Sequence, residues 1–206
     1  MDKEAPHYKL KVLLDEEMCE CNRREVTDEL AERFCVNHGS SKSSRKRLVS
    51  TLFSVPQTRL DLLPQYARFA AIVDRVYDDV AAPLVANLEA QFHGQAKWRK
   101  TQNIDGRLKT SRFIGELTKF RVAPPIVPLH CLKRCLEDFS GSNIDVACCL
   151  LETCGRFLYR TAHTQDLLSK LLDTMMRLRK AKVSTQSKYL LHVNDVSIRS
   201  LAKQRM

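Results

Sequence analysis

The chain has 206 residues, 44% of them hydrophobic and 28% charged, which is ordinary for a globular protein with one sizeable core. Its 6 Gly and 7 Pro residues are too few for a turn-rich β fold, and it lacks an apolar run of about 18 residues that could cross a membrane. The net charge of +10 indicates anionic partners, nucleic acid or acidic protein, although a solvated basic surface would give the same charge. The amino-terminal residues lack the apolar core of a secretory signal, so an intracellular protein is expected.

Apolar residues at steps of three and four predict five helices in the first half of the chain. The first is expected over 8–18 and the last over 80–92. The second begins at a capping box formed by Asn22 and Glu25 and ends near Gly39. The third begins with the basic run 42–47, and the fourth begins at Leu62-Leu63-Pro64. Residues 94–109 follow as the longest predicted loop.

The second half has the same helical period and centres on residues 144–160. Asn143 is the predicted N-cap of that helix, and Asp145 lies in its first turn, where the helix dipole favours negative charge. We expect this helix and the one containing 112–120 to face each other at the centre of the fold. The other predicted helices run over 108–120, from Pro124-Pro125, from Thr164 and, more weakly, over 187–202. Helices joined by short turns, with no strand pattern, predict an all-α stack of antiparallel pairs.

Eight cysteines in this setting are expected to be reduced. No C-x-x-C pair occurs, and His130 does not complete a zinc pattern, so neither a metal nor another cofactor is predicted. The histidines have no Ser or Cys partner at a catalytic spacing, and no Gly-rich phosphate loop is present, so an enzyme is not expected. Five cysteines fall in helical apolar patterns and are predicted to pack in the core: Cys131, Cys135, Cys148, Cys149 and Cys154.

Basic residues gather in two stretches that are candidates for contact with RNA. Basic groups around an aromatic ring can neutralise and stack on a single strand. Alternatively, Trp98 fixes its loop to the core, and the run 42–47 is a solvated helix end. Both interpretations stay open for the candidate residues, which are Lys97, Trp98, Arg99, Lys100, Lys109, Arg112, Lys119 and Arg121 in one stretch, and Lys42, Arg45, Lys46 and Arg47 in the other.

Several blocks of sequence, in order, resemble one known family. Together they cover about 26–182 and are similar to the middle of three MIF4G modules in the second up-frameshift family, the scaffold of nonsense-mediated mRNA decay. The combination of TSRFIGELTKF and LLETCGRFLYR is specific to that family. The blocks are SRKRLVSTLFSVPQTRLDLLPQYAR (44–68), QNID (102–105), TSRFIGELTKF (110–120), LHCLK (129–133), NIDVACCLLETCGRFLYR (143–160) and the weaker MMRLRKAK (175–182).

The resemblance implies a MIF4G domain of about five antiparallel helix pairs, HEAT-like, over 22–200. An N-terminal extension with a short helix (1–21) and a basic tail (201–206) would flank it. It also implies a non-enzymatic scaffold, cytoplasmic and including the perinuclear region, that positions neighbouring MIF4G modules and decay factors, with weak sequence-independent RNA binding. Residues after Lys182 depart from the family's Pro-rich continuation.

The partners implied by the family are the up-frameshift helicase, the exon-junction-bound third up-frameshift protein and the kinase that phosphorylates the helicase. In the family, the contacts to the helicase and to the third up-frameshift protein lie on segments outside this chain. Two other functions stay open at this stage: an initiation-type MIF4G module that docks a DEAD-box helicase, and a module that primarily binds RNA.

Overall fold

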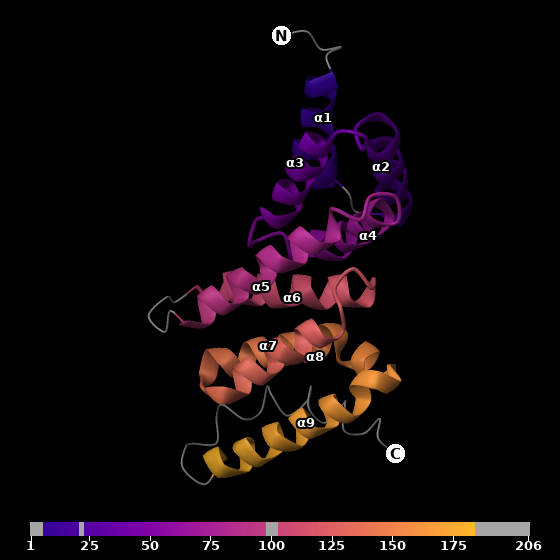
Figure 1. Cartoon of the computed structure of the whole chain (residues 1–206). Coiled ribbons are helices and arrows are strands. Elements are labelled where there is room, and N and C mark those ends of the chain that lie inside the picture. Colours follow the sequence, from indigo (N-terminus) through magenta and orange to yellow (C-terminus); the bar gives the residue numbers. More distant parts are fainter. Residues whose placement is uncertain (1–5, 21–22, 98–102, 184–206) are drawn as a thin grey trace.

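The computed structural model describes residues 6–20, 23–97 and 103–183. Within these ranges the chain forms nine α-helices, two short 3-10 helices and no strand, which confirms the predicted all-α class. The helices follow one another along an elongated stack, from α1 at one end to α9 at the other (Figure 1). Their bounds are α1 (Pro6–Asp15), α2 (Arg24–Asn37), α3 (Lys42–Phe53), α4 (Leu63–Asp74), α5 (Ala81–Lys97), α6 (Ile104–Lys119), α7 (Ile126–Glu137), α8 (Gly141–Arg160) and α9 (Ala162–Val183).

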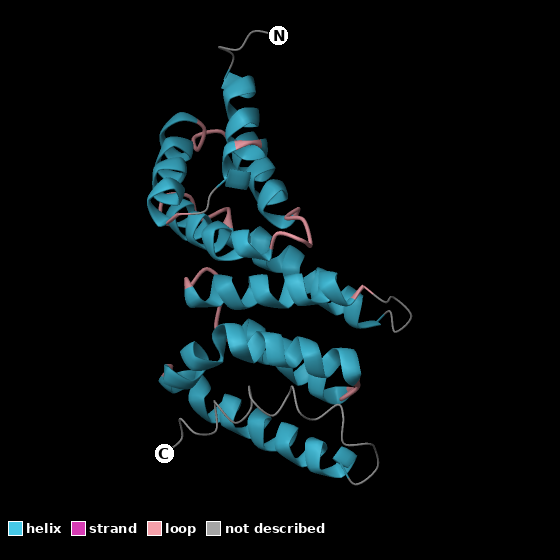
Figure 2. Ribbon diagram, turned by 180° about the vertical axis from the view of Figure 1, so that it is seen from behind, coloured by secondary structure: helices cyan, strands magenta, loops and turns pink. Residues whose placement is uncertain are grey.

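The contacts between helices place them in two layers of one stack, which Figure 2 shows from behind. Helices α2, α4, α6 and α8 contact one another in succession, and α3, α5, α7 and α9 do so in the second layer. Contacts between consecutive helices, such as α5 with α6 and α7 with α8, join the layers. Each helix therefore buries its apolar face only against near neighbours in the chain, which is the arrangement of a HEAT-like solenoid.

Helices α6 and α8 make the most extensive contact in the described part of the chain, as predicted for two facing central helices. They run parallel to each other. Near their starts, the Arg107 guanidinium donates to Ser142 Oγ over 3.0 Å. Further along, Gly115 lies directly against Thr153. The carboxyl ends of α6 and α8 therefore lie at the same edge of the stack.

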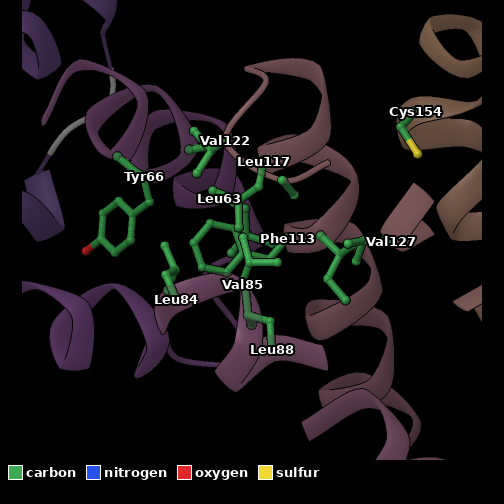
Figure 3. Packing of buried hydrophobic residues seen from close by; sticks show 14 of the residues in the cluster. Leu63, Tyr66, Leu84, Val85, Leu88, Phe113, Leu117, Val122, Val127 and Cys154 are labelled. Carbon is green, nitrogen blue, oxygen red and sulfur yellow. The ribbon is translucent and has the colours of Figure 1, made fainter. Parts of the chain in front are cut away.

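The hydrophobic core is continuous through the stack, and Phe113 lies near its centre (Figure 3). Its side chain is 0% exposed. Leu63 of α4, and Leu84 and Leu88 of α5, surround the ring, and Leu117 follows it one turn later on α6. Because three helices contribute to this cluster, it joins the two layers at mid-stack.

Helix α8 begins one turn before its predicted start, at Gly141 with Ser140 as the N-cap residue. Asn143 is therefore not the cap and lies within the first turn. Its side-chain amide donates to the Asp138 carbonyl over 2.6 Å, and its carbonyl oxygen accepts from the Arg107 guanidinium. A polar residue suited to capping is used instead to join the α7–α8 turn to α6.

The prediction of a long loop over 94–109 is wrong. Helix α5 continues to Lys97, and α6 already begins at Ile104. Asn103 supplies the missing start signal, because its Oδ1 accepts from the Gly106 N–H over 2.9 Å. The prediction failed because the end of α5 and the start of α6 are rich in basic residues, a composition that resembles a loop.

Some predicted features lie outside the described residues. The last predicted helix, over 187–202, is one, and the basic tail 201–206 is another. Asn22 lies outside them too, and the residue at the N-cap of α2 is Arg23, whose side chain makes no capping bond. The first predicted helix is confirmed, but it ends at Asp15 and gives way to a 3-10 helix, η1 (Glu17–Glu20).

Lowering the pH should destabilise the fold through His38, which is 8% exposed at the end of α2. Burial lowers the pKa of this imidazole, because the charged form is poorly solvated there. The unfolded state then binds the proton more readily, so stability present above the unfolded pKa is lost as the pH falls below about 6.5. In urea denaturation between about pH 7.5 and pH 5, a His38→Gln variant should lose less stability than the parent. Equal losses in both proteins would contradict this assignment.

Candidate interaction surfaces

The predicted RNA-contacting residues of α6 do not form one exposed surface. Lys109 is only 6% exposed, and its ammonium donates to the Val55 carbonyl over 2.9 Å. Burial lowers the pKa of this lysine. The side chain thus fixes the α3–α4 connection against α6 and is not available to a phosphate. Arg112 is half-buried, whereas Lys119 and Arg121 are exposed.

Two exposed arginines of α8 lie near the end of α6 and were not among the predicted site residues. Arg156 and Arg160 occupy the last turns of α8, and the parallel register of the two helices brings them to the edge where Lys119 and Arg121 lie. We call these four residues the basic edge. Glu116, almost fully buried, forms an ion pair with Lys119 over 2.8 Å and offsets part of its charge.

Arg121 has a backbone conformation that is unusual for a residue with a side chain. Its φ is 63°, in the left-handed region, and it is the one such non-glycine residue in the described ranges. The conformation ends α6 by letting the Val122 N–H donate to the Leu117 carbonyl over 2.9 Å. Glycine is the residue that adopts this conformation most easily, so an arginine here carries a backbone cost of about 1–2 kcal/mol.

Exchange of Arg121 for glycine should therefore raise the free energy of unfolding by about 1 kcal/mol, since glycine adopts a positive φ without strain. Urea denaturation of the Arg121→Gly variant measures the change. Arg121→Ala, which removes the same guanidinium but keeps a Cβ, is the matched control and should show no such gain. Equal stability of the two variants would mean that the left-handed conformation is not strained.

The second predicted stretch, on α3, is divided between structural and free basic groups. Arg45 donates from Nε and Nη2 to the two carboxylate oxygens of Asp79, over 2.6 and 2.9 Å, which lowers the pKa of that carboxyl group. It also donates to the Gly39 carbonyl over 2.6 Å, and its guanidinium lies 4.9 Å from the Tyr77 ring centre. Arg47 forms an ion pair with Asp15 over 3.4 Å. Both arginines thus join helices of the stack.

Lys42 and Lys46 are the exposed basic groups of this stretch, and both line a pocket between α3 and the amino-terminal half of α5. Its volume is about 380 Å³. A pocket could not be predicted from the sequence, because α3 and α5 come together only in the folded stack. The lining residues are Lys42, Lys46, Val49, Ser50, Asp79, Pro83 and Asn87.

The remaining predicted site residues, Trp98, Arg99 and Lys100, lie outside the described residues, and of Lys97 only the backbone is described. RNA contact by these four residues stays a prediction.

Four of the five cysteines predicted to pack in the core do so. All are free, and Cys131, Cys135, Cys148 and Cys154 are buried, whereas Cys149 is half-buried. Burial raises the pKa of Cys135, Cys148 and Cys154 to about 12, so these side chains remain neutral thiols at physiological pH. In the described ranges no three His, Cys, Asp or Glu side chains are grouped as metal ligands would be. No helix there is long and apolar enough to cross a membrane.

The two-layer stack, in which each helix packs against near neighbours in the chain, defines the class of helical-repeat proteins. The MIF4G domain family matches residues 14–197, and the chain belongs to this family. The MIF4G fold implied by the sequence resemblance is thereby confirmed.

Three relatives specify the kind of MIF4G protein that this chain resembles. The chain is 44% identical over 175 residues to "Regulator of nonsense transcripts 2" of Homo sapiens, and 43% identical over 162 residues to "Regulator of nonsense transcripts UPF2" of Arabidopsis thaliana. These matches cover 84% and 79% of the chain but 14% of each relative. "Nonsense-mediated mRNA decay protein 2" of Schizosaccharomyces pombe is 32% identical over 157 residues, which are 76% of the chain and 15% of that relative. The chain thus corresponds to one module of much longer proteins, and the resemblance to the second up-frameshift family is confirmed.

Proposed function

We propose that the chain is a non-enzymatic scaffold module of the nonsense-mediated mRNA decay machinery, which holds neighbouring modules and protein partners in a fixed arrangement. The relatives are named as regulators of nonsense transcripts, a description of regulation rather than catalysis. The single observation that carries the proposal is the match of the MIF4G family and these relatives over most of the chain. A continuous core along the stack supports a rigid spacer.

Affinity purification of the full-length protein that contains this chain, tagged in its own cells, tests the proposal. Up-frameshift decay factors should co-purify after nuclease treatment, and a cytoplasmic and perinuclear location should be seen for the same tagged protein. Recovery of translation initiation factors and a DEAD-box helicase without decay factors would instead favour the initiation-type function and contradict the scaffold proposal.

Weak, sequence-independent RNA binding is a second candidate function, and the basic edge is the observation that favours it. All four residues of the basic edge are exposed, with Lys119 and Arg121 at the end of α6 and Arg156 and Arg160 in the last turns of α8. Lys and Arg bind phosphates without any sequence motif, and the affinity then depends steeply on salt. The strained backbone at Arg121 also supports a role for that side chain, because strained residues cluster at functional sites.

Charge reversal at the basic edge should weaken RNA binding and reduce its salt dependence. For single strands, each lost phosphate contact lowers the slope of log affinity against log salt by about 0.7, so Arg121→Glu with Arg156→Glu should lower it by about 1.4. Fluorescence anisotropy of a labelled single-stranded RNA at several salt concentrations measures the slope. The control is the double variant Lys133→Glu with Lys170→Glu, which changes the net charge by the same amount. These two lysines lie on the exposed faces of α7 and α9, away from the basic edge. Equal slopes for the two double variants would exclude the basic edge as an RNA-binding surface.

A further inference from the structure

The pocket between α3 and α5 has more positive charge than its own acid can balance. Asp79 is the acidic residue of its lining, and that carboxylate already accepts two hydrogen bonds from Arg45. Lys42 and Lys46 remain exposed at the rim. Lys42 lies near enough to Asp79 to lower the pKa of that carboxyl group further, and Lys46 has no ion-pair partner among the described residues. The pocket is therefore positively charged overall.

The ends of two helices add to this positive charge. Ser41 is the N-cap residue of α3, so Lys42 begins the helix, and no acidic residue lies in the first turn. The first turn of α5 has no acidic residue either, and the pocket also lies against Pro83 in that turn. A basic side chain in the first turn of a helix, such as that of Lys42, is unfavourable because the helix dipole is positive there. A bound anionic group near Lys42 would offset this effect, whereas at the start of α5 the Asp74 carboxylate already accepts a hydrogen bond from the Ala81 N–H.

The shape and chemistry of the pocket indicate which anionic partner it fits. Val49 and Pro83 give it apolar walls, with Ser50 and Asn87 as hydrogen-bonding groups beside them. A volume of about 380 Å³ lies within the range of pockets that enclose a ligand. Single-stranded RNA binds to aromatic platforms, and the lining contains no aromatic residue. An acidic peptide with a neighbouring apolar side chain matches both the charge and the walls.

We propose that the α3–α5 pocket binds an acidic peptide segment of a protein partner, with an apolar side chain between Val49 and Pro83 and its carboxylates at Lys42 and Lys46. This inference rests on the proposed scaffold function, since it specifies the chemistry of one partner. Arg45 balances the charge of Asp79, so the two lysines remain as the excess positive charge of the pocket.

Selection of a displayed random peptide library on the purified chain tests the proposal directly. The enriched peptides should combine acidic and apolar residues, and their synthetic, labelled forms should bind Lys42→Glu/Lys46→Glu about tenfold or more weakly. Asn87→Trp, which places bulk at the rim without changing charge, should weaken the same peptides. Lys133→Glu/Lys170→Glu changes the net charge equally and should bind them nearly as well as the parent.

Three outcomes would overturn the pocket proposal: no enrichment, enriched peptides without acidic residues, or peptides that bind both double variants equally. Loss of RNA binding, rather than peptide binding, in the Lys42→Glu/Lys46→Glu variant would assign these lysines to nucleic acid and also contradict the proposal. The co-purification experiment is independent of all these outcomes. If decay factors co-purify with the protein but the library yields no selective peptides, the scaffold function still stands and only the peptide-binding role of this pocket is excluded.

Discussion

Replacement of Phe113 by alanine should lower the free energy of unfolding by about 3–5 kcal/mol. The ring is 0% exposed and lies between α4, α5 and α6 (Figure 3), so the substitution loses its burial and leaves a cavity. Neighbours from three helices cannot all move inward without disturbing their own contacts, which keeps the cost near the upper end of this range. Since a domain has only about 5–15 kcal/mol of stability, the variant should lose a large part of it.

Urea denaturation followed by circular dichroism measures this loss, at low temperature if the variant is marginal. Phe53→Ala is the control, because Phe53 is only half-buried at the end of α3 and should cost clearly less. A Phe113→Ala variant that loses no more stability than Phe53→Ala would contradict the central position of this ring in the core.

The substitution Gly115→Ala should cost about 2 kcal/mol, although alanine normally stabilises a helix relative to glycine. A Cβ at position 115 would lie 2.7 Å from Thr153 Cγ2 and 2.9 Å from Thr153 Cβ, in the contact between α6 and α8. Thr153 is held by a 2.7 Å hydrogen bond from its hydroxyl to the Cys149 carbonyl, so it cannot turn away freely. The two central helices would have to separate.

Gly94→Ala provides the matched control for this prediction. A Cβ at that position of α5 meets nothing within 4 Å, so the same substitution should stabilise the protein by about 0.5–1 kcal/mol. Adding Thr153→Ser to Gly115→Ala removes the nearest methyl and should recover part of the loss. If both glycine substitutions shift the free energy of unfolding in the same direction, the close contact between α6 and α8 is not as described.

The fold was predictable from the sequence where apolar periodicity was strong and turn residues were clear. The helix that follows Pro124-Pro125 and the helix that follows the turn at Ser140 are predictable, because at each place a helix stop is followed by a long apolar stripe. The junction of α5 and α6 was not found, because its helix ends are basic and polar. Its one clear signal was Asn103, which lies among residues that resemble a loop.

The candidate surfaces were less predictable, because exposure depends on contacts distant in sequence. Lys109 looked like an ordinary surface lysine, yet its partner Val55 lies on the connection between α3 and α4. Arg45 similarly forms its ion pair with Asp79, which lies in the connection between α4 and α5. Arg156 and Arg160 were visible as charges at a helix end, but their place beside α6 follows only from the parallel register of α6 and α8.

The half-life of a reporter transcript with a premature stop codon tests whether this module takes part in nonsense-mediated mRNA decay. The measurement compares cells whose gene for this protein is intact with cells in which the sequence for residues 23–183 has been deleted. A decay scaffold predicts that deletion lengthens the half-life of the premature-stop transcript and leaves the matching normal transcript unchanged. Unchanged decay of both transcripts, with the shortened protein present at normal levels, would contradict a role for this module in nonsense-mediated decay.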